Sequence, residues 1–553
     1  MPGKTATRER TLHGKRSRAV QAKQDRAWQA TWLLLAGIVF VLVIAIRIRL
    51  LGIPLERDEG EYAYAGQLIL QGIPPYKLAY NMKFPGTYVT YAGIMSVLGQ
   101  TIGGIHFGFL LLNLATIALI FFLGRRLINL AAGIGAAASY AVLSANPGVL
   151  GLAAHSEHFV MLPVLGGMLL LLRQTERNSF RGVFFSGLLL GIGLLMKQPA
   201  IFFVLFGVIY VVLCEVRSPP GPKGIILRTL IFGAGALVPF AITSVFLWHA
   251  GVFDKFWFWT IDYARQYGSL IPLGQAPHMF AQGVKQAIGS AWVLWALAGF
   301  GLLTGLWHKE TRTSTGILLG LLTASALALS SGFYFRHHYF VLALPAVSLL
   351  AGVAISRLSD FTASRTTVIR LLPLLLLGAA LTLPIFASRK LFFEVSPAEA
   401  SRMIYGLNPF PESIKIAEYI REHTTPNETI AVLGSEPQIY FYSKRHSATG
   451  YIYTYGLMEV QSHARLMQEE MMHEIELARP KYLISVQVDT SWLRHRESES
   501  RIFAWATEYN NTYYNIVGLV NILSPDRTDY YFDQIPKPLP QLDAYVLIRQ
   551  RKS

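Results

Sequence analysis

The sequence predicts a polytopic α-helical membrane protein that carries a small soluble α/β domain at its C-terminus. Composition is the first indication, because 52% of the 553 residues are hydrophobic and 15% are charged, whereas soluble domains are about 25% charged. The second is that apolar runs recur from Trp28 to Ala387. The third is that charge rises and apolar runs shorten after Ala387. We therefore expect three regions: a basic cytoplasmic tail (1–27), a transmembrane domain (28–388) and a soluble domain (389–553).

Eleven apolar runs are candidate membrane spans. Several are shorter than the roughly 20 residues that a bilayer requires, so their boundaries are approximate and we expect 11–13 spans in all. In chain order the runs are Trp28–Ile46, Ile105–Leu123, Ala131–Asn146, Phe159–Leu172, Gly182–Met196, Ala200–Cys214, Thr229–Trp248, Ala287–Trp307, Ser314–Gly332, His338–Ile355 and Leu371–Ala387.

The distribution of Lys and Arg predicts an orientation. The first 26 residues hold eight basic side chains, and the following run lacks a small-residue cleavage site, so we expect an uncleaved anchor with a cytoplasmic N-terminus. Every Arg-rich loop then falls on the cytoplasmic side, provided that residues 86–104 do not fully cross. This places residues 51–104, the 151–158 loop, the 249–286 loop and the C-terminal domain on the outer face of a plasma (inner) membrane.

The net charge of +16 does not predict nucleic-acid binding. The basic residues occupy the tail and the short loops between apolar runs, which is the pattern of cytoplasmic membrane flanks. The one cysteine, Cys214, excludes an intrachain disulfide.

The C-terminal region alternates helical periodicity with short β-branched runs. We expect helices at 411–423 and 458–478, strands at 429–433 and 482–486, and a short element at 438–442. The aromatic and charged run at 434–451 is typical of sugar-binding surfaces, although aromatic residues in such a run more often serve packing.

A carboxylate cluster follows the first span. Asp58, Glu59 and Glu61 stand together in a chain with only 33 acidic residues. A carboxylate at a membrane surface can serve as a general base or hold a divalent cation, so Asp58 is the candidate base and Asp58 with Glu157 the candidate metal ligands. The metal would be Mg²⁺ or Mn²⁺ and is optional.

The same residues also have a structural explanation. Asp58 and Glu61 have the spacing of a helix capping box, and apolar residues then recur at helical spacing until Gly72. Asp58 could therefore cap an amphipathic helix that lies on the outer membrane surface. The two roles are compatible in one residue.

Basic side chains recur in the other predicted outer segments. Lys83 precedes Pro85, Lys197 stands at a turn between two apolar runs, and Arg336 and Tyr339 open a later span. Arg265 lies in an aromatic loop with Asp262 and Tyr263. Each could be an interfacial anchor, but together they are typical of a phosphate site.

The short loop at 151–158 supplies His155, Glu157 and His158. Zinc is a weak interpretation, because this spacing matches no standard helical ligand motif. A second catalytic or metal-binding carboxylate at Glu157 is the stronger one, and a solvated loop is the alternative.

At these motifs the chain resembles the GT-C superfamily of membrane glycosyltransferases. It is most similar to the glycosyltransferase 39-like group, which contains protein mannosyltransferases, lipid A aminoarabinose transferases and Rgt-type lipopolysaccharide core transferases. The resemblance covers residues 28 to about 360. It rests on the motifs at Asp58–Tyr62, Gly72–Pro74, Lys83–Pro85, Gly124–Leu127, Lys197–Pro199 and Arg336–Pro345.

The resemblance implies inverting transfer of a hexose or pentose from a polyprenyl-phosphate sugar to a hydroxyl of a glycan, lipid or protein. Asp58 would be the base, with Glu59 or Glu157 assisting; Glu157 stands where the family commonly has Asp. Membrane lipids would surround the protein. The lipid phosphate would be bound by Lys83, Lys197, Arg265, Arg336 and Tyr339.

Two other classes of protein fit part of the pattern. A lipid or sugar transporter or flippase would also have many spans, but transporters place their sites near the bilayer midplane and commonly carry internal repeats, and the chain has no clear repeat. A non-catalytic scaffold would tolerate substitution of Asp58.

Overall fold

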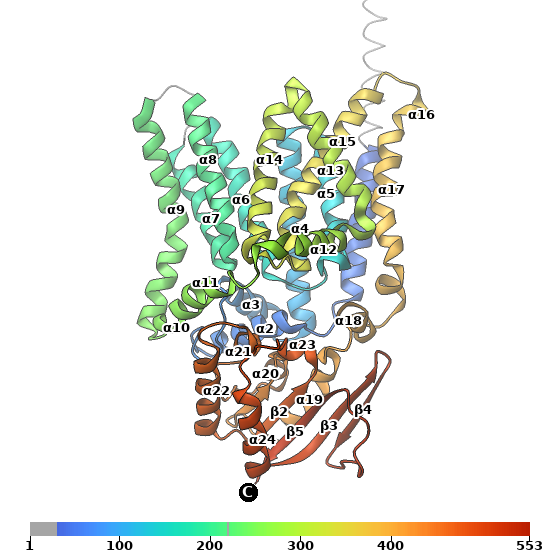
Figure 1. Ribbon diagram of the computed structural model, residues 1–553. Helices are drawn as coiled ribbons and strands as arrows, with labels where there is room; N and C mark the ends of the chain where they lie inside the picture. The colour runs from blue at the N-terminus through green and yellow to red at the C-terminus, as the bar shows by residue number, and fades with distance from the viewer. Residues whose placement is uncertain (1–29, 178, 218–220, 553) are drawn as a thin grey trace, which may run out of the picture.

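The computed structural model describes residues 30–177, 179–217 and 221–552. Among these residues, nine helices are long and apolar enough to cross a membrane, and the shorter apolar helices Leu130–Leu143 and Phe180–Met196 bring the number to eleven. All eleven run between the two ends of one bundle (Figure 1). The protein is an integral membrane protein with the predicted number of spans, while the predicted basic tail lies outside the described residues.

The bundle contains every predicted span. Its helices, after the first span Ala30–Arg49, are α4 (Ile102–Leu127), α5 (Leu130–Leu143), α6 (Ser156–Arg177), α7 (Phe180–Met196), α8 (Ile201–Arg217), α9 (Gly221–His249), α13 (Trp292–Trp307), α14 (Lys309–Leu329), α15 (Leu344–Thr362) and α17 (Leu372–Ala387).

The centre of the bundle is helix α15. Of the apolar window that contains it, 94% is buried, as expected for a helix that is apolar on all sides. It packs closely on α5: a Cβ added at Gly352 would lie 2.3 Å from the carbonyl oxygen of Ala132. Small residues permit such close helix approach inside membranes.

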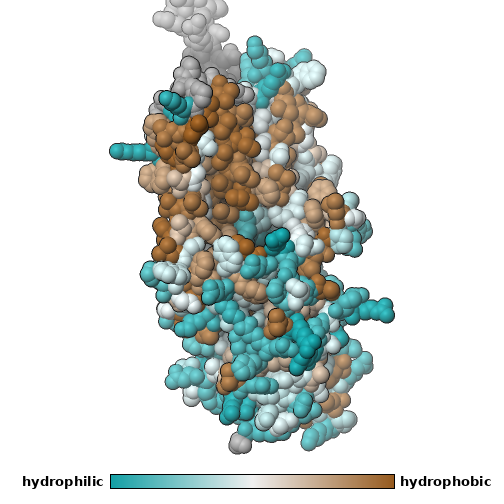
Figure 2. All heavy atoms as spheres, turned by 60° about the vertical axis from the view of Figure 1, so that its left-hand side comes forward, coloured by the Kyte–Doolittle hydropathy of each residue, from teal (hydrophilic) through white to brown (hydrophobic). Residues whose placement is uncertain are grey.

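The outer helices of the bundle present apolar side chains outward. Leu230, Leu237 and Ile242 of α9 are each more than 60% exposed. Figure 2 shows hydrophobic residues in a broad band over the helical bundle and hydrophilic residues over the C-terminal domain. This band is the surface expected to face lipid.

Residues 86–104 do not cross the bundle. Helix α3 (Gly86–Leu98) has 13 residues and lies beside α2 (Arg57–Leu70), at the end of the bundle that carries the C-terminal domain (Figure 1). A Cβ added at Gly86 would lie 2.5 Å from the carbonyl oxygen of Leu195, so α3 begins against the end of α7. The predicted grouping of the loops at one end therefore agrees with the structure.

Several short elements cover this end of the bundle. They are η1 (Pro147–Val149), η2 (Gln198–Ala200), α10 (Phe253–Trp257), the π-helical turn η3 (Phe258–Tyr263), α11 (Ala264–Tyr267), η4 (Leu273–Gln275), α12 (Ala276–Ile288), η5 (Gly289–Ala291), η6 (Ser331–Phe333) and η7 (His337–Ala343). α16 (Thr367–Arg370) lies at the other end (Figure 1).

The C-terminal domain is a five-stranded sheet with helices packed around it. The sheet order is β1-β2-β5-β3-β4, with β1 and β2 parallel and the other pairs antiparallel. Its elements are η8 (Lys390–Glu394), α18 (Pro397–Tyr405), α19 (Phe410–Glu422), β1 (Ile430–Leu433), α20 (Gln438–Ser443), α21 (Tyr455–Met458), α22 (Ala464–Ala478), β2 (Tyr482–Gln487), α23 (Asp489–Trp492), α24 (Arg501–Tyr513), β3 (Tyr514–Ser524), β4 (Arg527–Phe532) and β5 (Ala544–Arg551).

The α/β class of this domain is as predicted, and the predicted helix at 411–423 and both predicted strands are present. The helix expected at 458–478 begins only at Ala464, because Met458 ends the separate short helix α21 and residues 459–463 form bends and a turn. The aromatic run at 434–451 contributes to packing: Tyr440 is fully buried and lies 5.2 Å from the ring of Tyr64. One apolar core thus continues from α2 into the sheet.

Candidate active site

The first turn of α2 differs from the predicted cap. Glu56 is the N-cap and forms a capping box with Glu59, so the helix begins at Arg57. The prediction of Asp58 as the cap is wrong, because Glu56 and Glu59 have the same capping-box spacing and start two residues earlier. Asp58 is therefore not occupied by the helix backbone, and its carboxylate is available for other contacts.

Helix α2 is also not exposed at a membrane surface. Its residues from Glu59 to Leu68 are buried, since α3 packs on it from one side and the C-terminal domain from the other. A Cβ added at Gly60 would lie 2.7 Å from the backbone nitrogen of Gln438. The helix is therefore buried between the two domains and forms the contact between them, rather than presenting an exposed amphipathic face.

Lys83 binds two carboxylates of α2. Its Nζ donates to Asp58 Oδ1 at 2.9 Å and to Glu61 Oε2 at 2.8 Å, and it lies 4.6 Å from the centroid of the Tyr62 ring. Burial alone would raise the pKa of Asp58, but Lys83 and two nearby histidines outweigh it and hold that pKa well below its usual range. Burial likewise opposes the charge of Lys83, yet the two carboxylates raise its pKa well above the ordinary value.

Glu59 points away from this group. Its Oε1 accepts a hydrogen bond from the backbone N–H of Ala154 at 2.6 Å and lies 3.0 Å from His106 Nε2. Glu59 thereby ties α2 to the 151–155 loop and to α4. The arrangement fixes the orientation of the helix that carries Asp58.

Glu157 and Lys197 form a second buried ion pair. Glu157 lies in the first turn of α6 and is fully buried, and Lys197 joins α7 to η2. Lys197 Nζ lies 4.0 Å from the centroid of the Tyr339 ring, and His338 Nε2 lies 3.9 Å from Glu157 Oε1. Both lysines of the predicted phosphate site are thus held by carboxylates.

The two predicted arginines are placed differently. Arg336 precedes η7, is held by the Tyr267 hydroxyl 3.3 Å from its Nη2, and lines a cavity beside the C-terminal domain. Arg265 is exposed and does not line this cavity. The aromatic side chains that reach the cavity from that loop are Trp259, Tyr263 and Tyr267.

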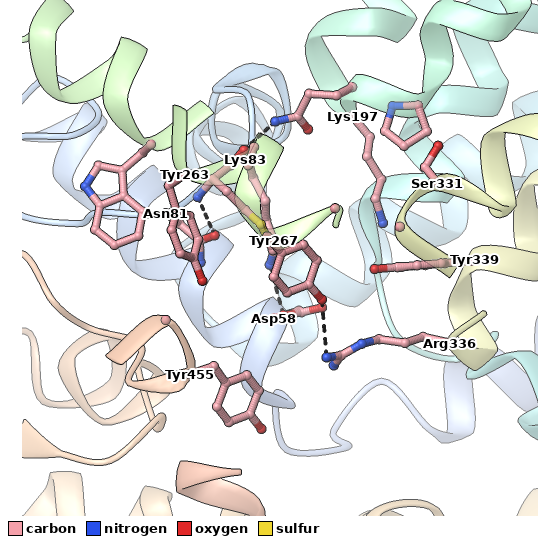
Figure 3. Close-up of a pocket in the computed structure, with 18 of the residues that line it drawn as sticks. Asp58, Asn81, Lys83, Lys197, Tyr263, Tyr267, Ser331, Arg336, Tyr339 and Tyr455 are labelled. Atoms are coloured by element: carbon pink, nitrogen blue, oxygen red, sulfur yellow. Dashed lines mark hydrogen bonds and ion pairs between the residues drawn. The ribbon is translucent and has the colours of Figure 1, made fainter. Parts of the chain in front are cut away.

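This cavity has a volume of about 210 Å³ and brings together distant parts of the chain. Figure 3 shows Asp58 and Lys83 near its centre, Lys197, Arg336 and Tyr339 on one side and Asn81 and Tyr263 on the other. Side chains of the C-terminal domain complete the wall. The lining includes Asp58, Tyr80, Asn81, Lys83, Lys197, Trp259, Tyr263, Tyr267, Arg336, His338, Tyr339, Tyr453, Tyr455 and Glu459.

A metal would fit a different set of ligands from the predicted pair. One ligand atom each of Asp58, His155 and His338 lies within 4.8 Å of the others, whereas Glu157 is engaged by Lys197. The two imidazole rings are stacked with centroids 4.4 Å apart. Both nitrogens of His155 are buried without a hydrogen-bond partner among the described residues, which is unfavourable unless they bind a ligand.

Comparison with known proteins agrees with this architecture. Residues 83–249 match the family model described as dolichyl-phosphate-mannose-protein mannosyltransferase. The structure of ArnT from Cupriavidus metallidurans bound to undecaprenyl phosphate is similar, with a TM-score of 0.55 and 18% identity over 93% of this chain and 99% of that one. The chain has a GT-C fold. 

A second GT-C structure is also similar. The oligosaccharyltransferase AglB from Archaeoglobus fulgidus, in complex with an inhibitory peptide and a dolichol-phosphate, aligns with a TM-score of 0.52 and 12% identity over 93% of this chain and 75% of that one. No curated protein sequence matches the chain.

The cavity contains residues that sequence patterns did not indicate. Tyr453, Tyr455 and Glu459 come from the C-terminal domain and line the cavity. Tyr453 donates to Asp58 Oδ1 at 3.1 Å, across 395 positions of sequence. The only sequence signal was the cluster of tyrosines at 451–455, and periodicity gives no indication of which distant surface it meets.

Proposed function

We propose that the protein is a glycosyltransferase that moves a sugar, with inversion, from a polyprenyl monophosphate to a hydroxyl acceptor. The bundle would be the transferase domain (28–388), with residues 389–553 as a separate domain. We further propose that the cavity opens at the outer face and that the N-terminus is cytoplasmic. The predicted positions of the Arg-rich loops support this orientation.

The observation that carries the proposal is the combination of Asp58 with three cationic side chains in one cavity. Lys83, Lys197 and Arg336 line it together with Asp58, at the end of a bundle with a lipid-facing band. Cations are required where negative charge develops on a leaving phosphate, and a carboxylate is required where a hydroxyl loses its proton.

In this proposal Asp58 is the general base. The Lys83 ammonium now pairs with Asp58 Oδ1 and keeps its pKa low, which makes the carboxylate a weak base. A phosphate that binds Lys83 would compete for the ammonium and raise the basicity of Asp58. Donor binding would thus prepare the base for the acceptor hydroxyl.

The leaving phosphate would be bound by Lys83, Lys197, Arg336 and the Tyr339 hydroxyl. Arg265, which is exposed, is a weaker candidate and would at most contact lipid headgroups. Glu59 and Glu157 act as positioning residues in this proposal, because each is engaged with its own cation or backbone donor.

A divalent cation could be held by Asp58, His155 and His338. Imidazole nitrogens suit Zn²⁺ better than Mg²⁺ or Mn²⁺, which changes the preferred metal from the sequence-based prediction. A cation there would supply positive charge beside the phosphate. The chemistry assigned above to Asp58 and the three basic residues does not depend on it.

Loss of the lipid-linked sugar tests the function. Purified protein in proteoliposomes is incubated with a panel of undecaprenyl- and dolichyl-phosphate sugars, and donor consumption is compared between wild type and Asp58→Asn. We expect consumption to fall by a factor on the order of 10² to 10⁴, the usual contribution of a general base. Movement of intact lipid between leaflets without cleavage would instead indicate a flippase.

A further inference from the structure

The C-terminal domain contributes a continuous stretch to the cavity. Tyr453, Tyr455, Gly456 and Glu459 all line it, and all lie in or beside the short helix α21. The helix packs tightly there, because a Cβ added at Gly456 would lie 2.9 Å from the Tyr263 hydroxyl. This stretch is thus held at a defined distance from the membrane domain.

Glu459 is the acidic residue of this stretch, and its side chain is buried. It is 9% exposed, and its Oε2 accepts a hydrogen bond from the Tyr263 hydroxyl at 2.6 Å. Among the described residues, none donates a hydrogen bond to its other oxygen, Oε1. A buried carboxylate with an open acceptor position in a cavity is suited to a donor group on a ligand.

The walls around Glu459 are mostly aromatic. Tyr80, Trp259, Tyr263 and Tyr267 line the same cavity. The Trp259 ring packs edge-on to Tyr263 with ring centroids 5.0 Å apart, and the Tyr267 ring stacks on Tyr334 with centroids 4.5 Å apart. Each of these rings is therefore held by a neighbouring ring. Rigid rings beside a hydrogen-bonding carboxylate and the Asn81 amide suit a ligand that is apolar on one face and rich in hydroxyls at its edge.

This part of the cavity is unsuited to a phosphate. Glu459 would repel an anion, and Figure 3 shows Tyr263 and Asn81 on the side opposite Lys197 and Tyr339. Asp58 lies between the two sides. A sugar ring that occupied the Glu459 side would thus lie next to the proposed base, with the cationic side beyond it.

We propose that Glu459 and Tyr263, with the aromatic side chains around them, form a binding site for the hydroxyl groups of a sugar ring. The site rests on the proposed function and deepens it, since it assigns part of substrate recognition to the C-terminal domain. The ring belongs either to the donor sugar or to a glycan acceptor, and the two sources share the same chemistry.

Binding measurements on the full-length protein test the site without requiring turnover. Three probes are titrated into detergent-solubilised protein: undecaprenyl phosphate without a sugar, undecaprenyl phosphate carrying mannose or glucose, and a panel of free methyl pyranosides. Because Trp259 lines the cavity, tryptophan fluorescence can report binding, and calorimetry provides a second readout. The variants are Glu459→Gln and Tyr263→Phe, with Glu469→Gln on the exposed face of α22 as the matched control.

We expect Glu459→Gln to weaken binding of sugar-bearing probes about tenfold and to leave undecaprenyl phosphate unchanged, since it removes a charged acceptor only from the hydroxyl site. Tyr263→Phe should have a smaller effect in the same direction, and Glu469→Gln none. A loss confined to the lipid-linked sugar identifies the donor ring, and a loss confined to the free glycosides identifies the acceptor ring.

Three results would overturn the proposal: no binding of any sugar-bearing probe beyond that of the sugarless lipid, equal losses for all probes, or no loss in Glu459→Gln. Failure of sugar transfer in the donor-consumption assay, with these binding differences intact, would instead reject the proposed reaction and retain the sugar site.

Discussion

The two walls of the cavity differ in how their charges are balanced. On the membrane side, each lysine is paired with a carboxylate: Lys83 with Asp58 and Glu61, and Lys197 with Glu157. On the side of the C-terminal domain, Glu459 has a tyrosine partner, and the other side chains are mainly aromatic. The first wall suits a reaction in which a phosphate gains negative charge and a carboxylate takes up a proton. The second wall suits an uncharged, hydroxyl-rich ligand.

Arg57 of α2 joins the two walls, so its substitution should have the largest effect on the arrangement. Arg57 donates to Glu436 at 2.8 Å, to the Ser435 carbonyl at 2.5 Å and to the Tyr455 hydroxyl at 2.6 Å. Glu436 is fully buried. We expect Arg57→Ala to destabilise the protein by about 3–5 kcal/mol, because it leaves an unpaired buried charge, measurable by thermal unfolding in detergent.

The matched control for this prediction is Arg501→Ala, whose pair with Glu469 is partly exposed, with side chains 51% and 36% accessible, and should contribute about 0–1 kcal/mol. The double variant Arg57→Ala, Glu436→Gln should recover part of the loss. Equal melting temperatures for Arg57→Ala and Arg501→Ala would mean that the junction does not depend on this ion pair.

Substitution of Lys83 tests whether the charge balance on the membrane side of the cavity is needed for activity. Lys83→Met leaves Asp58 and Glu61 without their shared cation, so the pKa of Asp58 should rise while phosphate binding is lost. We expect donor consumption to fall by about 10² or more, by analogy with the loss of one charge-stabilising donor in an enzyme site. Lys83→Arg should retain part of the activity; full activity in Lys83→Met would exclude Lys83 from the phosphate site.

The membrane wall could be predicted from sequence much better than the opposite wall. Spans are encoded by local composition, and Asp58, Lys83 and Lys197 stand out because charge is rare beside apolar runs. By contrast, Glu459 is one acidic residue in an ordinary soluble domain, and it reaches the cavity because α21 packs against Tyr263 of the membrane domain. Such contacts depend on tertiary packing, and the hydrophobic periodicity of the sequence does not indicate them.

Local competition explains the error at the start of α2. Glu56 and Asp58 stand two residues apart, each three residues before a glutamate, so the sequence offers two capping boxes. The structure uses Glu56, and Lys83 then pairs with Asp58. Lys83 lies 25 positions later in the chain, so local spacing alone does not reveal this partner of Asp58.

Arg336 and Arg265 differ in position, and this difference predicts different effects on donor affinity. Arg336 lines the cavity and Arg265 is exposed outside it. Arg336→Ala should therefore weaken the apparent affinity for the lipid-linked donor about tenfold, the usual loss of one charge-assisted hydrogen bond, while Arg265→Ala should change it less than twofold. The reverse order, measured by donor titration in proteoliposomes, would move the phosphate site toward the 253–267 segment.

The pH dependence of sugar binding gives the smallest and most specific effect. Burial raises the pKa of Glu459 to about 7, although the Tyr263 hydrogen bond and Arg336 oppose this. Tyr263, Tyr267 and Tyr334 face the same group and have pKa values raised far above neutrality, so they stay uncharged. Below pH 7 Glu459 becomes protonated and loses acceptor strength, and binding of sugar-bearing probes should weaken severalfold between pH 8 and pH 6.

The sign of the accompanying stability change distinguishes this titration from others. The pKa of Glu459 is higher in the folded protein, at about 7, than in the unfolded protein, at about 4.5. Its contribution to the free energy of unfolding therefore falls as the pH rises from about 4.5 through 7. Wild type should therefore become less stable relative to Glu459→Gln over that range, while its sugar binding improves. If Glu459→Gln keeps the pH dependence of binding, the titrating group lies elsewhere in the cavity and the contrast between the two walls fails.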